Sequence, residues 1–209
     1  MRIAVIGAGN VGGGFARAGV AAGHEVVISA AHAGKAEALA AEVGARAAAS
    51  NVAAVEGAQL VVFAVPGTAA PAVAAELAPA LQDAVIVDAT NPLNASFSGL
   101  DVTGVSGAED VQQAAGSVPV VKAFNTVFAS RYAAPTENGE PLQVLLAGDD
   151  AAAKARVAEV ATSLGFAPLD AGGMRLARAL EEMAFLNITL NATNGWAWQS
   201  AWQLVGPTA

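Results

Sequence analysis

The chain has 209 residues, of which 55% are hydrophobic and 13% charged, and it contains no cysteine. The length suits one sizeable domain, or one domain with an appendage, and the composition excludes an intrinsically disordered chain. The lack of cysteine excludes disulfides, thiolate metal sites and a cysteine nucleophile. The two histidines, His24 and His32, are too few for a histidine-rich metal centre, so we expect no metal.

Charge and hydropathy narrow the range of partners. A net charge of −8 at pH 7 argues against nucleic acid and against an anionic membrane surface. The longest apolar stretch, residues 60–75, is interrupted by two prolines and a glycine, whereas a membrane-spanning helix needs about 20 uninterrupted apolar residues. Glycines also interrupt the apolar run of the first ten residues, unlike that of a signal peptide. We therefore expect a cytoplasmic protein that binds neither nucleic acid nor membrane.

Short apolar runs alternate with alanine-rich helical stretches along the chain, the pattern of a parallel sheet covered on both faces. The predicted strands are residues 2–6, 25–29, 60–64, 84–88, 118–121 and 142–147. The predicted helices are residues 11–22, 35–43, 68–77, 151–164 and a last stretch from about 174 to 193. Residues 91–107 are predicted to form a loop, because they are rich in Gly, Ser and Asn.

A glycine-rich loop follows the first predicted strand. Gly7-Ala8-Gly9-Asn10-Val11-Gly12 matches G-x-G-x-x-G and opens the first predicted helix, the context of a dinucleotide-binding turn. Gly7 would permit the tight turn, Gly9 would let the backbone approach a pyrophosphate, and Gly12 would allow close helix packing. The free N–H groups at the helix start would hold the phosphates. The competing interpretation is a plain strand–turn–helix crossing built of small residues.

The loop and the alternation together predict the fold class: α/β, a doubly wound, mostly parallel Rossmann-type sheet with a C-terminal helical appendage. We place a boundary after residue 121. Residues 1–121 would form the NADP-binding domain. Residues 122–209 would form an extension of one strand, helices and an aromatic tail, which packs on the sheet and contributes the substrate pocket and dimer contacts.

The end of the second strand bears on which dinucleotide binds. NAD sites usually carry Asp or Glu there, bonded to the ribose hydroxyls. Here the chain reads Ser29-Ala30-Ala31-His32, with Lys35 following and no acid. Ser29, His32 and Lys35 could therefore contact a 2′-phosphate, which favours NADP over NAD. The competing interpretation makes Lys35 a solvated residue of the first turn of its helix.

With the glycine loop in place, further motifs become recognisable in order along the chain. They are VVFAVP at 61–66, DATNPL at 88–93, VKAFNT at 121–126, AGDD at 147–150 and PLDAG at 168–172. Together they resemble the coenzyme F(420)-dependent NADP oxidoreductases, a family that also includes the cytosolic domains of six-transmembrane metalloreductases. The resemblance spans about residues 1–190. Members commonly have Ser-Arg where this chain has Ser29-Ala30, and the deazaflavin enzymes tend to have His where it has Asn125.

The resemblance implies hydride transfer between NADPH and a flavin or deazaflavin-type ring, with coenzyme F(420), FMN or FAD as acceptor. By that similarity the pyrophosphate would contact Ala8, Gly9, Asn10 and Val11, and the 2′-phosphate would face Ser29 and Lys35. The adenosine or the pyrophosphate would be bordered by Val65 and Pro66. The nicotinamide and its partner ring would be approached by the turns at Asn91-Pro92 and Asn125-Thr126. Hydride transfer between stacked rings needs distance and water exclusion more than an acid–base residue. We assign no catalytic side chain, and we expect Asp88 and Asp170 to cap turns.

The last predicted helix carries a polar stripe. Asn187, Asn191 and Asn194 fall at i, i+4 and i+7, and Trp198 continues the series at i+11. Because buried unpaired amides are costly, this stripe must meet water, a partner chain or a polar ligand. A solvent-facing stripe and a dimer seam compete with a pocket wall.

We expect a flavin-sized pocket between the nicotinamide end of the glycine-loop site, the Asn125-Thr126 turn and the last helix. Asn125, Thr126, Asn187 and Asn191 would contact the substrate, and Trp198 could close one side. A long apolar C-terminal helix also favours a homodimer. The alternative functions are a non-catalytic NADP(H)-sensing protein, and a reductase of imines or carbonyls, which would need a general acid near Asn125 that the sequence does not supply.

Overall fold

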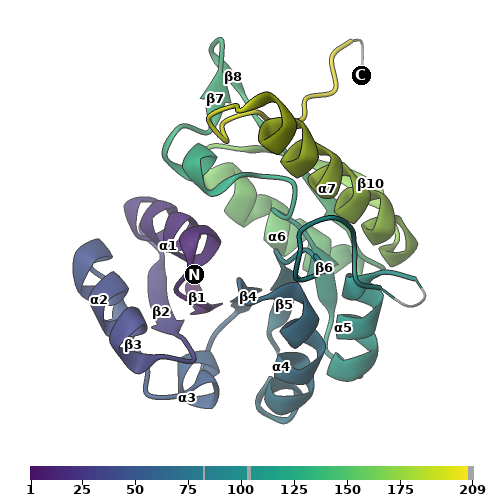
Figure 1. Ribbon diagram of the computed structural model, residues 1–209. Coiled ribbons are helices and arrows are strands. Elements are labelled where there is room, and N and C mark those ends of the chain that lie inside the picture. The colour runs from purple at the N-terminus through teal and green to yellow at the C-terminus, as the bar shows by residue number, and fades with distance from the viewer. Residues whose placement is uncertain (82, 103–104, 207–209) are drawn as a thin grey trace.

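The computed structural model describes residues 1–81, 83–102 and 105–206 (Figure 1). Eight strands form one sheet in the order β10-β9-β6-β5-β4-β1-β2-β3. The strands are β1 (Arg2–Ile6), β2 (Glu25–Ser29), β3 (Arg46–Ala47), β4 (Leu60–Phe63), β5 (Val85–Asp88), β6 (Val120–Lys122), β9 (Gln143–Ala147) and β10 (Ala167–Gly172). Strands β7 (Thr136–Glu137) and β8 (Glu140–Pro141) form a separate hairpin.

Seven α-helices connect the strands within the described ranges. They are α1 (Asn10–Ala21), α2 (Ala33–Val43), α3 (Asn51–Val55), α4 (Ala70–Leu77), α5 (Gly107–Ala115), α6 (Ala151–Ser163) and α7 (Ala177–Asn194). Short 3-10 turns, η1 (Gly67–Ala69), η2 (Ala78–Ala80), η3 (Ala129–Ala133) and η4 (Met174–Leu176), lie between them. None of the helices that the structure describes combines the length and the apolar character required to cross a bilayer.

The pairing of the strands confirms the predicted α/β class. β1 pairs in parallel with both β2 and β4, and β5 and β6 continue the parallel sheet. β9 pairs antiparallel with β6 through Lys122 and Ala147, and β10 runs parallel to β9. The sheet is therefore continuous across residue 121. The division into a domain of residues 1–121 and an extension of residues 122–209 remains a proposal.

Helices cover both faces of the sheet, as the near-continuous apolar strands predict (Figure 1). Alternate side chains of β1 point to opposite faces. Ile3 and Val5 join the core under α1, α2 and α6, whereas Ala4 and Ile6 join the core under α3, α4, α5 and the start of α7. All four are at most 1% exposed, so the first strand is buried on both sides.

The predicted strands and helices are found near their predicted bounds, but several short elements were missed. The structure adds β3, α3, α5, β10 and the β7–β8 hairpin. Residues 103–104 of the predicted loop 91–107 lie outside the described ranges; the loop ends one residue early, because α5 begins at Gly107. The Ser-x-x-Glu pattern of a capping box marks this start: the Ser106 hydroxyl accepts from the Glu109 backbone N–H at 3.1 Å and donates to the Glu109 carboxylate at 2.8 Å.

Candidate active site

A cavity of about 1640 Å³ opens at the carboxyl edge of the parallel strands. Its lining comes from the start of α1, the segments that follow β4, β5 and β6, the loop of residues 91–101, the middle of α7 and Trp198. Ligands of open α/β sheets bind outside the carboxyl ends of the strands, so this is the expected place for a site. Asn10, Val11, Asn125, Thr126 and Asn187, all predicted from sequence, lie together here.

The glycine loop forms a tight turn with an open helix start. Gly7 has φ +118°, and a β-carbon there would collide with the Ala64 carbonyl group. A β-carbon on Gly12 would collide with the Gly7 carbonyl oxygen. By contrast, a β-carbon on Gly9 would meet no atom within 4 Å, and no side chain caps α1. The first N–H groups of α1 therefore have no side-chain cap and lie next to an open position, which fits a phosphate.

The predicted 2′-phosphate contacts lie at the end of β2 and the start of α2, outside the cavity lining. The Ser29 carbonyl accepts from the Gly7 N–H at 2.8 Å, which places this strand end beside the glycine turn. The Ser29 hydroxyl is buried and donates to Asn51 Oδ1 at 2.8 Å. His32 and Lys35 are exposed at the start of α2.

Two asparagines join the ends of β5 and β6. Asn91 Nδ2 donates to the Asn125 carbonyl at 2.9 Å, and Asn125 Nδ2 donates to Asn91 Oδ1 at 2.9 Å and to the Leu180 carbonyl at 3.0 Å. Two acceptors around Nδ2 fix the orientation of the Asn125 amide, because the flipped amide would set its oxygen against them. Asn125 Oδ1 is then buried with no partner among the described residues. Such an acceptor is available to a donor on a ligand.

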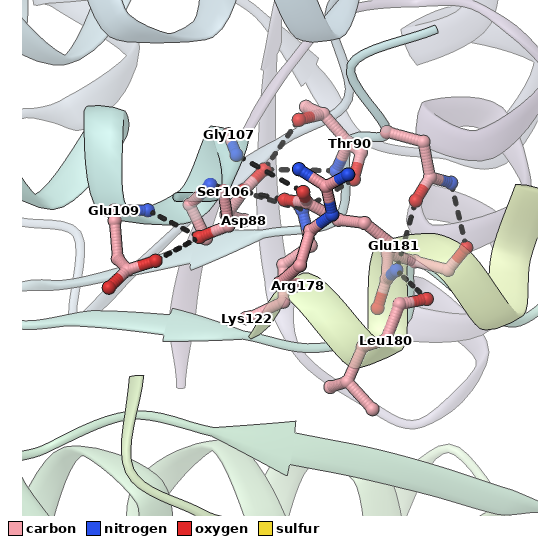
Figure 2. Close-up of polar contacts among 12 residues, drawn as sticks. Asp88, Thr90, Ser106, Gly107, Glu109, Lys122, Arg178, Leu180 and Glu181 are labelled. Carbon is pink, nitrogen blue, oxygen red and sulfur yellow. Dashed lines mark hydrogen bonds and ion pairs between the residues drawn. The ribbon is translucent and has the colours of Figure 1, made fainter. Parts of the chain in front are cut away.

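A fully buried ion cluster joins the same two strands, β5 and β6, to α7 (Figure 2). Lys122 Nζ lies 2.9 Å from Asp88 Oδ2 and 3.0 Å from Glu181 Oε1, and donates to the Thr90 carbonyl at 2.7 Å. Glu181 also accepts from the backbone N–H groups of Gly107 and Ala108 at the start of α5, both at 3.1 Å. The cluster therefore ties together β5, β6, α5 and α7.

The sequence analysis did not predict this cluster, although two of its charged residues stand out at the ends of apolar strands. Asp88 and Lys122 end two apolar strands and occupy matching positions in the sheet. Glu181 lies at i+3 from Arg178 on α7, which makes it one of two candidate partners of that arginine by spacing alone; Arg178 pairs with the other, Glu182, at 2.7 Å. The cluster also lies next in sequence to the site residues: Thr90 precedes Asn91, and Leu180, whose carbonyl binds Asn125, precedes Glu181.

The turn roles predicted for the two aspartates are confirmed. Asp88 Oδ1 accepts from the backbone N–H of Thr90 at 3.0 Å and from its hydroxyl at 2.7 Å. Asp170 Oδ1 accepts from the Gly172 N–H at 2.8 Å. The ammonium group of Lys154, which donates to the Asp170 carboxylate, lowers the pKa of Asp170. Neither aspartate lines the cavity.

The asparagine stripe meets the tail of its own chain, a partner that the sequence prediction did not consider. The Ser200 hydroxyl donates to Asn187 Oδ1 at 2.6 Å and accepts from Asn191 Nδ2 at 2.7 Å. Asn187 lines the cavity, whereas Asn191 is 0% exposed and does not. The amide of Asn191 is satisfied inside the protein, because its Oδ1 also accepts from the Trp198 N–H at 3.2 Å.

The helical continuation to Trp198 was wrong. α7 ends at Asn194, because Gly195 adopts the left-handed conformation, with φ +63°, that commonly terminates helices. The chain then folds back along α7 (Figure 1). Trp198 reaches the cavity from this tail and not from the helix. Asn194 is exposed and donates to the Leu190 carbonyl at 2.8 Å.

Backbone strain also gathers at the cavity. Four non-glycine residues in the described ranges have positive φ. Three of them, Phe97 (56°), Phe124 (64°) and Trp198 (56°), line the cavity; the fourth, Asn138 (51°), lies in the turn between β7 and β8. Positive φ is a genuine outlier for bulky side chains, and such residues cluster at functional sites, where the surrounding contacts hold them.

Comparison with known proteins identifies the family of the chain. The sequence model of the family described as coenzyme F(420)-dependent NADP oxidoreductase matches residues 2–92. The F(420)-dependent NADP reductase of Methanothermobacter thermautotrophicus is 33% identical over 213 aligned positions, which cover 93% of this chain and 90% of that protein. The chain belongs to this family. It is an NAD(P)-dependent oxidoreductase.

Two further relatives of the F(420)-dependent NADP oxidoreductase family complete the comparison. A solved structure from Arthrobacter sp. FB24, described as a candidate F(420)-dependent NADP reductase, is 32% identical with a TM-score of 0.85, and the match covers 98% of this chain and 100% of that one. Metalloreductase STEAP3 of Rattus norvegicus is 36% identical over 105 residues, which are 50% of this chain and 21% of that protein.

Proposed function

We propose that this oxidoreductase transfers hydride between NADPH and a flavin or deazaflavin-type ring, bound side by side in the cavity. The single observation that carries the proposal is the continuity of the cavity from the open start of α1 to the unpaired Asn125 Oδ1. Pockets for one drug-sized ligand run from about 300 to 1,000 Å³. A volume of about 1640 Å³ has room for a nicotinamide nucleotide and a second ring.

The cofactor end of this proposal uses backbone more than side chains. The pyrophosphate would lie on the N–H groups at the start of α1, where Gly9 leaves room for it, beside Ala8, Asn10 and Val11. Val65 and Pro66, which follow β4 and line the cavity, would border the adenosine or the pyrophosphate. Bound NADPH supplies the hydride.

NADP preference is supported by the residues after β2. No carboxylate stands at this strand end to repel a 2′-phosphate, and the exposed His32 and Lys35 lie at the start of α2. The Ser29 hydroxyl is engaged by Asn51. We therefore expect His32 and Lys35 to make the principal 2′-phosphate contacts.

At the nicotinamide end, the chain's residues would orient the rings and exclude water. The reciprocal bonds between Asn91 and Asn125 hold the ends of β5 and β6 together, so the free Oδ1 of Asn125 has a fixed position from which to accept a ring N–H. Thr126 and Asn187 add polar groups to the same lining. Fixed geometry is the main requirement for this chemistry, and no acid–base side chain is invoked.

Anaerobic NADPH oxidation with FMN, FAD and coenzyme F(420) tests the proposal. Asn125→Leu should lower ring reduction about 10-fold, the cost of one lost hydrogen bond in a buried site, while NADPH affinity stays within a few-fold. Asn194→Leu, the same substitution at an exposed position of α7, should leave both unchanged. Circular dichroism checks that Asn125→Leu folds, and Asn125→Ser provides a milder variant.

The non-catalytic alternative predicts a different result. If the wild-type protein binds NADPH but does not oxidise it with FMN, FAD or coenzyme F(420), an NADP(H)-sensing role replaces the proposed reaction. Tight NADPH binding together with catalytic reduction of one of these ring acceptors supports the proposed oxidoreductase reaction.

A homodimer and a cytoplasmic location also belong to the proposal. α7 and the tail expose large apolar side chains, among them Leu186 (49%), Trp196 (48%) and Leu204 (60%), which suit a subunit interface. Sedimentation analysis should therefore give twice the chain mass. Cell fractionation tests the location.

A further inference from the structure

The acceptor end of the cavity is apolar and offers almost no charge. Among the described residues that line the cavity, only Arg17 and Asp101 are charged. Arg17 belongs to α1, and its guanidinium is engaged by Glu42 through bonds of 2.9 and 2.7 Å. The apolar part of the lining around the Asn125 turn and α7 is formed by Leu93, Phe97, Phe128, Phe185, Ile188 and Trp198, and uncharged polar side chains such as Ser96, Thr126 and Asn187 stand between them.

Trp198 is held at this wall through its backbone carbonyl, its backbone N–H group and its ring. Its carbonyl accepts from the Ser130 hydroxyl at 2.6 Å, and its N–H donates to Asn191 Oδ1 at 3.2 Å. The indole meets the Phe128 ring edge to face, with the centroids 5.6 Å apart and the planes at 78°. These contacts hold the residue at φ +56°, a conformation that a tryptophan would otherwise avoid.

The rest of the tail is fixed in the same way, although it has no regular secondary structure. Ser200 binds Asn187 and Asn191, and the indole nitrogen of Trp202 donates to the Met183 carbonyl at 3.0 Å. Gln143 of β9 exchanges hydrogen bonds with the backbone of Leu204, at 2.7 and 3.4 Å. Trp198 is thus set in place in advance, yet the residue is 45% exposed where it borders the cavity. A rigid, half-covered aromatic side chain suits the stacking of a ligand ring.

We propose that the acceptor subsite is built for an uncharged planar ring, that Trp198 covers one side of this ring, and that Asn125 Oδ1 accepts an N–H from its edge. This inference rests on the proposed function. An anionic substituent would lose hydration against walls that are mostly apolar and otherwise uncharged. No unpaired cation stands among the described lining residues, and the Asp101 carboxylate lies at the same cavity. Trp198 is accordingly a ring-binding residue, and the uncharged lining sets the preference between substituents.

Riboflavin and FMN provide the direct test, because they share one ring and differ by a phosphate group. Under anaerobic conditions with saturating NADPH, kcat/KM should be at least about 10-fold higher for riboflavin, with most of the difference in KM. An equal or higher value for FMN would overturn the inference.

Variants of the tail isolate the contribution of Trp198. Trp198→Ala should weaken riboflavin binding to the protein–NADP⁺ complex about 10-fold, measured by quenching of riboflavin fluorescence, because one stacking partner is lost. Trp198→Phe should recover most of that loss, and NADPH affinity should stay within two-fold in both. Trp196→Ala, on the same tail but outside the lining, is the matched control. Unchanged riboflavin affinity in Trp198→Ala would refute the assignment.

The binding measurement also separates this inference from the proposed function. Riboflavin that binds through Trp198 but is not reduced would support the subsite and contradict the proposed reaction. Reduction of FMN in preference to riboflavin would support the reaction and contradict the uncharged subsite. If riboflavin neither binds nor is reduced, the inference fails whatever other acceptor proves active.

Discussion

At the scale of single residues, the glycines of the first loop differ in how much space each leaves for a side chain. Gly7 and Gly12 have no room for a β-carbon, because backbone carbonyl groups occupy the space, whereas Gly9 faces open space. The motif therefore combines two positions required by the fold with one available to a ligand. Substitutions should separate these two roles.

Gly9→Val should abolish NADPH binding without unfolding the protein. The branched side chain would occupy the space that the pyrophosphate needs, yet it would meet no protein atom near its β-carbon. We expect the calorimetric affinity for NADPH to fall at least about 100-fold, the cost of roughly two phosphate hydrogen bonds to charged groups. Gly12→Val, in contrast, should destabilise the fold itself. A folded Gly9→Val variant with unchanged NADPH affinity would contradict the site.

Lys35→Glu should weaken NADPH binding much more than NADH binding. The substitution replaces attraction by repulsion at the one group that distinguishes the two cofactors, and a charge-assisted hydrogen bond contributes about 1.5–3 kcal/mol. The expected loss for NADPH is therefore roughly 10-fold or more. NADH, measured by the same titration, is the control. Equal losses for both cofactors, or a wild-type protein that prefers NADH, would refute the assignment.

At the scale of elements, the buried cluster of Asp88, Lys122 and Glu181 connects two strands and two helices (Figure 2). All three side chains are 0% exposed. A buried ion cluster adds little net stability over apolar packing, but removing one member leaves uncompensated charge. Because it joins Asp88 of β5, Lys122 of β6 and Glu181 of α7, it fixes where these three elements meet.

Lys122→Met should destabilise the protein by about 3–5 kcal/mol, because two carboxylates would remain buried without their cation. Urea unfolding measures the change. Arg178→Met is the matched control on α7: its pair with Glu182 is 39% and 50% exposed at the two side chains, so we expect a loss of less than about 1 kcal/mol. Similar losses of stability for Lys122→Met and Arg178→Met would show that the buried cluster matters no more to the fold than an exposed ion pair.

At the scale of the whole molecule, the cavity gathers residues from Asn10 to Trp198. Its lining comes from α1, from the segments that follow β4, β5 and β6, from α7 and from the tail, so a ligand that fills it contacts segments far apart in the sequence. Ligand binding should therefore be coupled to the unfolding of the whole chain and not of one segment.

NADPH should raise the melting temperature of the protein. At a concentration 100 times its dissociation constant, a ligand adds about 2.7 kcal/mol to the stability. For a chain of this size each kcal/mol corresponds to roughly 2–4 °C, so the shift should be about 5–10 °C. Gly9→Val should abolish the shift, as calorimetric scans with and without NADPH can show. A shift of the same size in Gly9→Val would contradict binding at the glycine loop.

Much of the fold could be predicted because its signals are local. The apolar strands, the glycine loop and the long helices are encoded within windows of five to twenty residues. Elements with weak or conflicting local signals were missed: β3 has two residues, and β10 contains Pro168, which an edge strand tolerates. The capping box at Ser106 and Glu109 was visible but lay beside a run of Gly, Ser and Asn.

The sequence by itself determined the fold class, the glycine turn and the polar residues at the strand ends, because these depend on periodicity and on conformations that only glycine adopts. Only the tertiary structure decided which distant residues meet. Lys122 finds Glu181, and Asn187 and Asn191 find Ser200. These pairings depend on how α7 packs against the start of α5 and how the chain reverses at Gly195. Buried polar groups then take whatever partner the packing brings within reach.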